Sequence, residues 1–600
     1  MIVASFYAVF LMNKKRFLLP ASIAAGLITA VLFLLLFLPR ISGSAADNTK
    51  FEHFTDDFFC KEITNSTLSL HYTLKDPSCY NLKNYSVSFG DASVEGRADE
   101  LRYLKDTKKS LSSFSYHNLS KSQQLTYDLL LDSLDSQIAL AKYELYEEPF
   151  TPNNGIHAQL PILLAEYAFS DQADIEEYLA LLEQVDVYFS QLLDFESEKA
   201  HCGKFMSDEQ CESVIESCEQ FLENRQNNLL LTSFENRIAS VEGLSAEEQA
   251  SYISKNGEMF WNHVRPAYEN VIHRMTSLLG SGKNDWGLCN YEDGADYYTL
   301  LVHTDTGTSE SMDELFEKIS SERDKDLSLC SEIIAKHPEF ASNSYDYDWS
   351  YANEIDMLDT LETALCKDFP TPLVTSYRIN YVAEDLQDAL APAFYITAPI
   401  DDYSDNCIYI NNAKNYSDIH YFTTLAHEGF PGHLYQTTMT YNYGIPSVRA
   451  LLDYPGYVEG WATYVELMSY HYAGLDEDLA TLLSHNQAAT LSLYAASDIG
   501  IHYYGWETKE LIDFWSRYGI TDTAVINDIA KLILADPGNY LKYYVGYLKF
   551  EELQTEMERK YGDNFSLMDF HEAILRIGPA QFDIFSKYFP SYYTIARSEK

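Results

Sequence analysis

The sequence predicts a mostly α-helical protein with one small β-sheet, and three observations support this prediction. Glycine and proline are scarce, at 26 and 18 of 600 residues, which weighs against the many turns of an all-β fold. Apolar residues recur at three- and four-residue spacing over long stretches, which is typical of amphipathic helices. The clearest strand-like patterning lies in one short stretch near residue 400.

The net charge of the chain limits the classes of molecule that it can bind. Asp and Glu together number 90 against 42 Lys and Arg, which gives a formal net charge of −48. A surface this acidic repels phosphate backbones, so nucleic-acid binding is excluded. Hydrophobic residues at 46% and charged residues at 22% are an ordinary globular balance. The composition suits a folded domain that works outside the cytoplasm.

The amino terminus predicts a membrane anchor. Residues 17–39 form an uncharged apolar run directly after three basic residues, and about 20 such residues span a bilayer. The basic cluster places residues 1–16 in the cytoplasm and everything after a linker at 40–50 outside the cell. Two alternatives stay open. Cleavage near residues 44–46 would release a secreted protein, and the run could be a buried core helix.

Nine cysteines fit an oxidising exterior, although the odd number leaves at least one unpaired. Closeness in sequence suggests a disulfide between Cys60 and Cys79, and another from Cys202 to Cys211 or Cys218. No CxxC spacing occurs, which excludes a cysteine-based zinc cluster.

Residues 51–600 are predicted to form one large, mainly helical domain. Its first half begins with LSLHYTL at 68–74, which is interpreted as a short strand, and continues with an amphipathic helix over 122–148. A longer helix is expected over 313–336. Capping-box spacing marks three further helix starts, at Ser207 and Gln210, Ser245 and Glu248, and Ser311 and Glu314.

The second half, from about 390 to 600, contains the expected chemistry. AFYITAPIDDYSDNCIYINN at 393–412 predicts two short strands around an acidic turn at 401–405. The second strand, Cys407–Asn411, precedes a helix that contains two histidines. An exposed edge on that strand could pair with an extended peptide through main-chain hydrogen bonds, and a buried connector is the equal alternative.

HEGFPGH, residues 427–433, pairs two imidazoles with a neighbouring carboxylate, as a zinc hydrolase requires. In the familiar HExxH pattern the histidines are four apart on one helical face, whereas His427 and His433 are six apart. Six steps rotate about 240°, so an ideal helix would separate them. Pro431 and Gly432 predict that the chain loops out and returns His433 to the metal. Spacing alone leaves open two histidines at a helix end.

Glu459 and Glu466 lie seven apart on a predicted helix and therefore share a face. Their apolar neighbours indicate a partly buried helix, and buried carboxylates need a metal or another cation. Glu459 could ligate zinc, and Glu466 could support a ligating histidine. A solvated helix face is the alternative.

Four sequence blocks resemble the domain of unknown function 885 family. HEGFPGH and EGWATYVE are similar to the family's HExxPGH and EGWALYxE, and DIGIHYYGW at 498–506 resembles DxGxHxxGW. Pro537 to Gly546 resembles PGQxxxYxxG, with Asn539 in place of Gln. The resemblance runs from about residue 50 to the end. The family is similar to helical zinc peptidases of the thimet oligopeptidase and carboxypeptidase Taq type.

This resemblance implies a helical metallopeptidase with its small sheet beside the zinc helix. His427, His433 and Glu459 would bind Zn²⁺, and Glu428 would act as general base. His502 and Tyr543 are the candidates for stabilising the oxyanion.

The prediction is therefore a membrane-anchored, extracytoplasmic zinc peptidase that takes peptide substrates. Two alternatives remain, namely a non-catalytic peptide-binding surface protein and a metal-dependent amidase or esterase. Glu428 weighs against the first alternative, because a protein that only binds peptides has no need for a base beside the metal.

Overall fold

The computed structural model describes residues 45–598, except for 83–84, 153, 224–226, 342–350, 352, 374–375, 383–386, 388–391 and 412–417. The predicted membrane span at 17–39 lies outside the described residues. Within the described part, none of the helices combines the length and apolar character that a membrane span requires.

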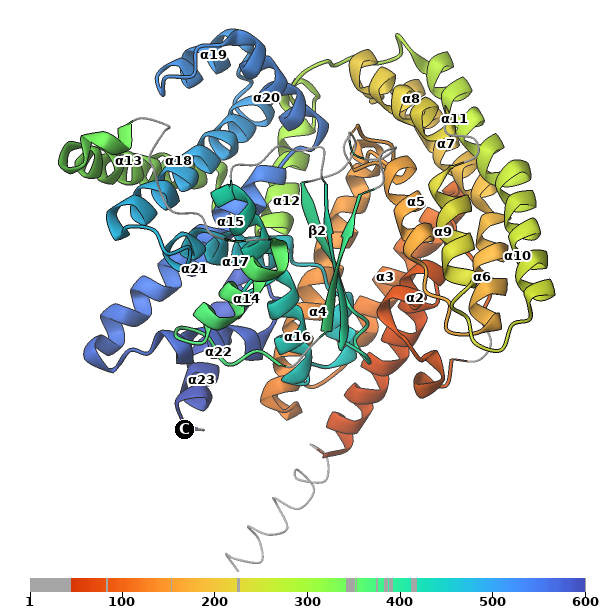
Figure 1. Cartoon of the computed structure of the whole chain (residues 1–600), viewed down its shortest axis with the longest axis horizontal. Helices are drawn as coiled ribbons and strands as arrows, with labels where there is room; N and C mark the ends of the chain where they lie inside the picture. The colour runs from red at the N-terminus through yellow and green to blue at the C-terminus, as the bar shows by residue number, and fades with distance from the viewer. Residues whose placement is uncertain are drawn as a thin grey trace, which may run out of the picture.

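Helices dominate the described chain, as predicted, and they form two lobes with separate hydrophobic cores (Figure 1). The smaller lobe, called here the α5–α11 lobe, was not predicted. Its helices are α5 (Ile156–Glu166), α6 (Gln172–Leu182), α7 (Val185–Cys202), α8 (Asp208–Glu223), α9 (Leu229–Ile238), α10 (Ala246–Met259) and α11 (Arg265–Leu278).

The larger lobe, called the main lobe, combines helices from both ends of the chain around one core. Its helices are α2 (Thr67–Thr73), α3 (Val94–Leu111), α4 (Lys121–Leu140), α12 (Gly294–Thr306), α13 (Met312–Lys336), α14 (Glu354–Leu365), α15 (Asp418–Glu428), α16 (His433–Asn442), α17 (Pro455–Ser469), α18 (Glu477–His502), α19 (Thr508–Ser516), α20 (Thr523–Ala535), α21 (Asn539–Tyr561), α22 (Leu567–Ile577) and α23 (Phe582–Ser598).

A three-stranded sheet stands near the middle of the molecule (Figure 1). β2 (Ala393–Ile396) and β3 (Asp405–Ile410) are the two predicted strands and pair antiparallel. β1 (Ser376–Tyr381), which was not predicted, pairs parallel to β3 on its other side. The prediction of an exposed edge on Cys407–Asn411 is therefore wrong for the strand itself, because β3 is central and β2 is an edge strand.

Local signals placed several helices correctly. The capping boxes at Ser245 and Ser311 form as expected, and α13 runs from residue 312 to 336. The strand predicted for LSLHYTL is wrong, since this segment forms helix α2. Its buried residues are Thr67 and Leu70, and Leu74, which follows its last residue, is also buried, so the spacing is three and four; Ser66 caps the start.

The predicted disulfides are also wrong. Cys60 and Cys79 are free thiols, as are Cys202, Cys211 and Cys218. Cys211 and Cys218 are instead fully buried in the core of the α5–α11 lobe, where they pack as small apolar side chains.

α17 and α21 cross with their backbones in contact. A Cβ atom added to Gly460 would lie 2.4 Å from the carbonyl carbon of Gly546, and one added to Gly546 would lie 2.0 Å from the Gly456 oxygen. Only glycine fits at this contact. The crossing brings the first turn of α21 close to the face of α17 that bears Glu459.

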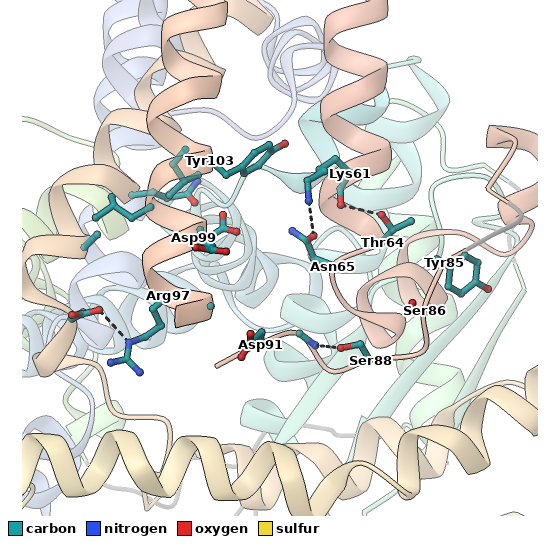
Figure 2. Close-up of a pocket in the computed structure, with 18 of the residues that line it drawn as sticks. Lys61, Thr64, Asn65, Tyr85, Ser86, Ser88, Asp91, Arg97, Asp99 and Tyr103 are labelled. Carbon is teal, nitrogen blue, oxygen red and sulfur yellow. Dashed lines mark hydrogen bonds and ion pairs between the residues drawn. The ribbon is translucent and has the colours of Figure 1, made fainter. Parts of the chain in front are cut away.

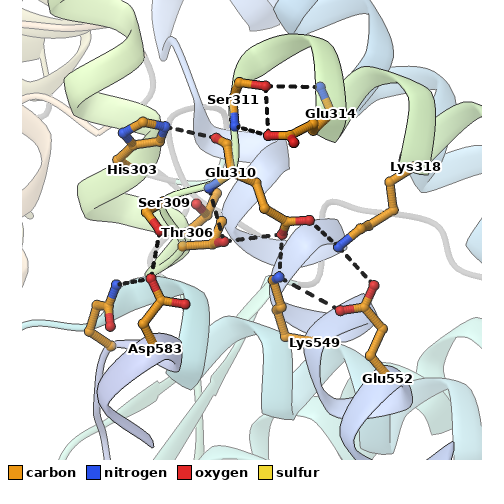
Figure 3. A network of polar contacts seen from close by, with 12 residues as sticks. His303, Thr306, Ser309, Glu310, Ser311, Glu314, Lys318, Lys549, Glu552 and Asp583 are labelled. Carbon is orange, nitrogen blue, oxygen red and sulfur yellow. Dashed lines mark hydrogen bonds and ion pairs between the residues drawn. The ribbon is translucent and has the colours of Figure 1, made fainter. Parts of the chain in front are cut away.

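A charged network holds α21 against the start of α13 (Figure 3). The Glu310 carboxylate forms ion pairs with both Lys318 and Lys549, and Lys318 also lies 2.7 Å from Glu552. Burial alone would raise the pKa of Glu310, but the two lysines outweigh it and lower the pKa to about 2. Each charge in this network, called the Glu310 network, therefore has a partner.

Candidate metal centre

The predicted interruption of the zinc helix is confirmed. α15 ends at Glu428 and α16 begins at His433, with Gly429 to Gly432 between them. The amide of Gly432 donates to the carbonyl of Ala426 at 2.9 Å, which folds the chain back on itself. A Cβ atom at Gly432 would lie 1.8 Å from the His427 carbonyl oxygen, so a side chain cannot be accommodated there.

This turn brings together the three predicted ligands. The Nε2 atoms of His427 and His433 lie 3.5 and 3.4 Å from the same carboxylate oxygen of Glu459. One ligand atom from each of the three residues lies within 4.8 Å of the others. Two imidazoles and one carboxylate are the kind of donor set that catalytic zinc sites use.

The polar atoms of this trio fit a cation. The Oε2 atom of Glu459 is buried without a hydrogen-bond partner in the described part of the chain, although it faces both imidazoles. Burial alone would raise the pKa of Glu459, but the imidazoles of His433 and His427 hold it below its usual range. Three lone-pair donors that face one point without bonding each other suit a metal ion.

Two further carboxylates flank the trio. Glu466 accepts a hydrogen bond from Nδ1 of His427 at 3.0 Å, so the expected support of a ligating histidine is present. Glu428 is 8% exposed and accepts a hydrogen bond from the Tyr395 amide of β2 at 2.8 Å. The β2 contact was not predicted, because the sequence does not reveal which strand edge faces Glu428.

Tyr543 lies beside the trio, on the first turn of α21. Its ring centre is 6.2 Å from that of His427, and its hydroxyl has no hydrogen-bond partner among the described residues. Burial raises the pKa of Tyr543, and the negative charges of Glu459 and Glu428 raise it further. The phenol therefore keeps its proton and can donate a hydrogen bond.

His502 does not join this group. Its Nε2 bonds to the carbonyl of Ile533 at 3.1 Å, and its Nδ1 accepts from the Leu288 amide at 3.2 Å. Burial lowers the pKa of His502 to about 4, so the ring is neutral. With both ring nitrogens bound to backbone, His502 has no N–H group for an oxyanion, and the role expected for it is replaced by a structural one.

Asp498, from the same sequence block, positions α21. Its carboxylate receives the Gly538 amide at 3.0 and 3.1 Å and the hydroxyl of Tyr298 at 2.6 Å. Burial raises the pKa of Asp498 to about 8. This contact fixes the turn from which α21, and with it Tyr543, begins.

Sequence reasoning missed a group of carboxylates near this turn, called here the Lys542 cluster. The pKa values of Asp305, Asp453 and Asp536 are all raised by burial, and Lys542 lowers each of them. Lys542 itself forms no ion pair within the described ranges. The only signal in the sequence was the position of Asp536, directly before the Pro537-Gly538-Asn539 block.

Two cavities lie near the boundary between the lobes. The larger, of about 1200 Å³, is polar and open between α3 and the helical residues 45–63 (Figure 2). Arg97, one of the two basic residues that line it, forms ion pairs with Glu144 and Glu198. The smaller, of about 240 Å³, is lined by Asp305, Asp536 and residues from both lobes. Glu147 lines both cavities, so they adjoin each other.

The sequence matches the family model of DUF885, described as bacterial proteins of unknown function, over residues 82–587. The chain belongs to the DUF885 family. All members of the trio lie inside the matched range, as do Glu428, Glu466 and Tyr543. A comparison with curated proteins gives no match.

Two solved structures share the fold of this DUF885 protein. A candidate lipoprotein from Colwellia psychrerythraea superimposes with a TM-score of 0.79 at 18% identity, covering 92% of this chain and 99% of the other. A candidate lipoprotein of unknown function from Shewanella oneidensis has a TM-score of 0.59 at 16% identity, covering 90% and 99%. At these identities the likeness concerns the fold.

Proposed function

We propose that this DUF885 protein is a zinc-dependent peptidase. The observation that supports it most is the convergence of His427, His433 and Glu459, with Glu428 directly after the first histidine. These three residues would hold Zn²⁺, which supplies Lewis-acid activation of water and of the substrate carbonyl when bound. Glu466 would keep His427 in the tautomer that presents Nε2.

The other residues of the site have separate tasks. Glu428 takes the proton of the attacking water and later delivers it to the leaving amine. The Tyr395 amide orients the Glu428 carboxylate through its hydrogen bond. Tyr543 donates its hydroxyl proton as a hydrogen bond to the oxyanion that develops on the carbonyl.

The position of β2 favours a peptide over another hydrolysable substrate. One edge of β2 pairs with β3, and the Tyr395 amide on the other edge points to Glu428. An extended peptide that pairs with this second edge would run past the base with its main chain aligned. The strand expected to bind peptide was Cys407–Asn411, and its antiparallel neighbour β2 takes that place in the proposal.

Membrane attachment forms part of the proposal. Residues 17–39 are long and apolar enough to span a bilayer. The two solved neighbours are described as candidate lipoproteins. In this chain the apolar run itself would be the anchor, because the first cysteine is Cys60.

Metal analysis of the purified protein, combined with product mapping on mixed synthetic peptides, tests the function. The wild type should carry about one zinc per chain and cleave peptide bonds. Glu428→Gln should keep the zinc and lose at least about 100-fold in kcat, the scale of general-base catalysis. His433→Ala should lose both zinc and activity.

Glu317→Gln is the matched control, since it removes an exposed carboxylate from α13. It should leave zinc content and kcat unchanged. Full activity in Glu428→Gln would remove the proposed base. Cleavage of esters or amides without any cleavage of peptides would favour the amidase or esterase alternative.

A further inference from the structure

The smaller cavity at the lobe boundary has an aromatic wall that already holds a cation. The rings of Tyr146 and Tyr297 stack at 4.6 Å between centres, and both line the cavity. The ammonium of Lys204 lies 3.5 Å from the centre of the Tyr146 ring and 2.9 Å from Asp293. The face of Tyr146 is therefore occupied by the protein's own ammonium group, which indicates that the aromatic wall of the cavity suits a cation.

The same cavity contains carboxylates that have no cationic partner. Asp305 lines the cavity and has neither an ion pair nor a side-chain hydrogen bond in the described part of the chain. The carboxylate of Glu147 likewise has no partner there. Burial raises the pKa of both groups, that of Asp305 to about 7. Glu147 is exposed at the mouth of the cavity, whereas Asp305 is partly buried, and a partly buried carboxylate without a partner is stabilised by a bound cation.

Asp305 places this cavity next to the helix that bears Glu459. A Cβ atom added to Gly456, near the start of α17 and three residues before Glu459, would lie 2.7 Å from the carbonyl oxygen of Asp305. On the outer side, the cavity shares Gln210 and Trp286 with a surface hollow of about 450 Å³. A ligand that enters from the surface therefore reaches the neighbourhood of the start of α17.

We propose that this cavity is the subsite for a positively charged group of the peptide substrate, either a lysine or arginine side chain or the free amino terminus. This inference rests on the proposed peptidase function and gives it a substrate class, namely peptides with a cation at a fixed distance from the cleaved bond. The cation lies against the Tyr297 ring and pairs with Asp305 and Glu147.

The test uses synthetic hexapeptides that are identical except for one lysine moved through a glutamine background. Each peptide is made with a free and with an acetylated amino terminus, which separates side-chain from amino-terminal recognition. At one register, lysine or the free amino terminus should raise kcat/KM by about tenfold, the scale of a charged hydrogen bond. Asp305→Asn and Glu147→Gln should each reduce this preference.

Asp324→Asn serves as the matched control, because it removes one exposed carboxylate from α13 outside the cavity. It should leave the preference unchanged. Equal cleavage of all peptides by the wild type, or a preference that survives in both cavity variants, would overturn the proposal.

Binding to Glu428→Gln, measured by calorimetry, separates this proposal from the peptidase function. Tighter binding of the cationic peptides, lost again in Glu428→Gln with Asp305→Asn, supports the subsite even if no peptide is cleaved. Cleavage without any effect of charge on kcat/KM or Kd leaves the peptidase and removes the subsite.

Discussion

Two lysines on α21, seven residues apart, have opposite surroundings. Lys549 belongs to the Glu310 network, in which each carboxylate contacts a lysine (Figure 3). Lys542 belongs to the Lys542 cluster, in which three aspartates surround one ammonium that contacts none of them within the described residues. Both groups are partly buried, so burial alone does not explain the difference.

The contrast indicates two uses of charge in one helix. Where α21 is held against α13, opposite charges are matched and the pKa of Glu310 is lowered. Near the start of α21, where Asp305 and Asp536 line the small cavity, negative charge is left in excess and the pKa of Asp305 is raised. Matched charges stabilise the fold. Unmatched buried charges destabilise it, and a bound cation would restore that stability.

The largest expected effect on stability comes from removing the central carboxylate of the Glu310 network. Glu310→Gln removes the carboxylate that contacts both Lys318 and Lys549, which are 18% and 15% exposed, and leaves them only Glu552. We expect the free energy of unfolding to fall by about 3 kcal/mol, as for other ion pairs that lose one partner. Urea unfolding measures it, and a loss below ~1 kcal/mol would show that the network adds little.

A comparison of the two lysines sharpens the contrast. Lys549→Met removes a contacting partner of Glu310 and should cost about 2 kcal/mol. Lys542→Met removes a cation that acts only at a distance, so its cost should be about 0.5 kcal/mol and should shrink in high salt. Urea unfolding in low and high salt compares them, and equal costs would contradict the distinction.

Neutralising a carboxylate of the Lys542 cluster should change the free energy of unfolding in the opposite direction. Asp305→Asn removes a partly buried carboxylate that has no partner, so it should raise the free energy of unfolding by up to about 1 kcal/mol at pH 8. The same variant should weaken cleavage of cationic peptides. Thermal unfolding measures the expected gain in stability, and a parallel kinetic assay measures the expected loss of activity on cationic peptides. A destabilised variant would contradict the absence of a partner for Asp305.

The smallest expected effect is a difference in how the free energy of unfolding depends on pH. Asp305 has a pKa of about 7 in the folded chain and about 3.9 when unfolded. Between these values the folded chain retains a proton that the unfolded chain has lost, so its contribution to stability falls as pH rises. Thermal unfolding from pH 4 to 7 should therefore show a smaller decline in Asp305→Asn than in wild type.

Glu310 behaves in the opposite way, because its folded pKa of about 2 lies below the unfolded value of about 4.3. Its stabilisation is complete above pH 4.3 and is lost as pH falls toward 2. Glu310→Gln should accordingly lose the most stability at neutral pH and almost none near pH 2. Equal losses of stability at both pH values would mean that the charge of Glu310 does not cause its stabilising effect.

The convergence of His427, His433 and Glu459 could be predicted because its signals are local. The spacing of His427 and His433, with proline and glycine between them, required a break in the helix. The seven-residue separation of Glu459 and Glu466 placed both on one face of α17. Such relationships are fixed within one or two helical turns, so the sequence contains them directly.

Predictions that depended on distant partners failed. His502 lies in a block that matches the family pattern, yet backbone groups of Leu288 and Ile533, far away in sequence, take both of its ring nitrogens. The edge of the sheet could not be assigned because β1, which covers β3, was not recognised. Likewise, the Lys542 cluster assembles residues from α12, the start of α17 and α21, and nothing in their local sequence links them.

The glycine contact between α17 and α21 restricts how the reaction geometry can vary. Because the two backbones touch at Gly460 and Gly546, a larger side chain cannot adjust the gap between Glu459 and Tyr543. Small shifts in that gap must come from tilting α21 as a whole about this contact. Such a tilt would carry Lys542 along with the phenol, so the proposed hydrogen-bond donor of the metal centre and the cation of the Lys542 cluster would be displaced together.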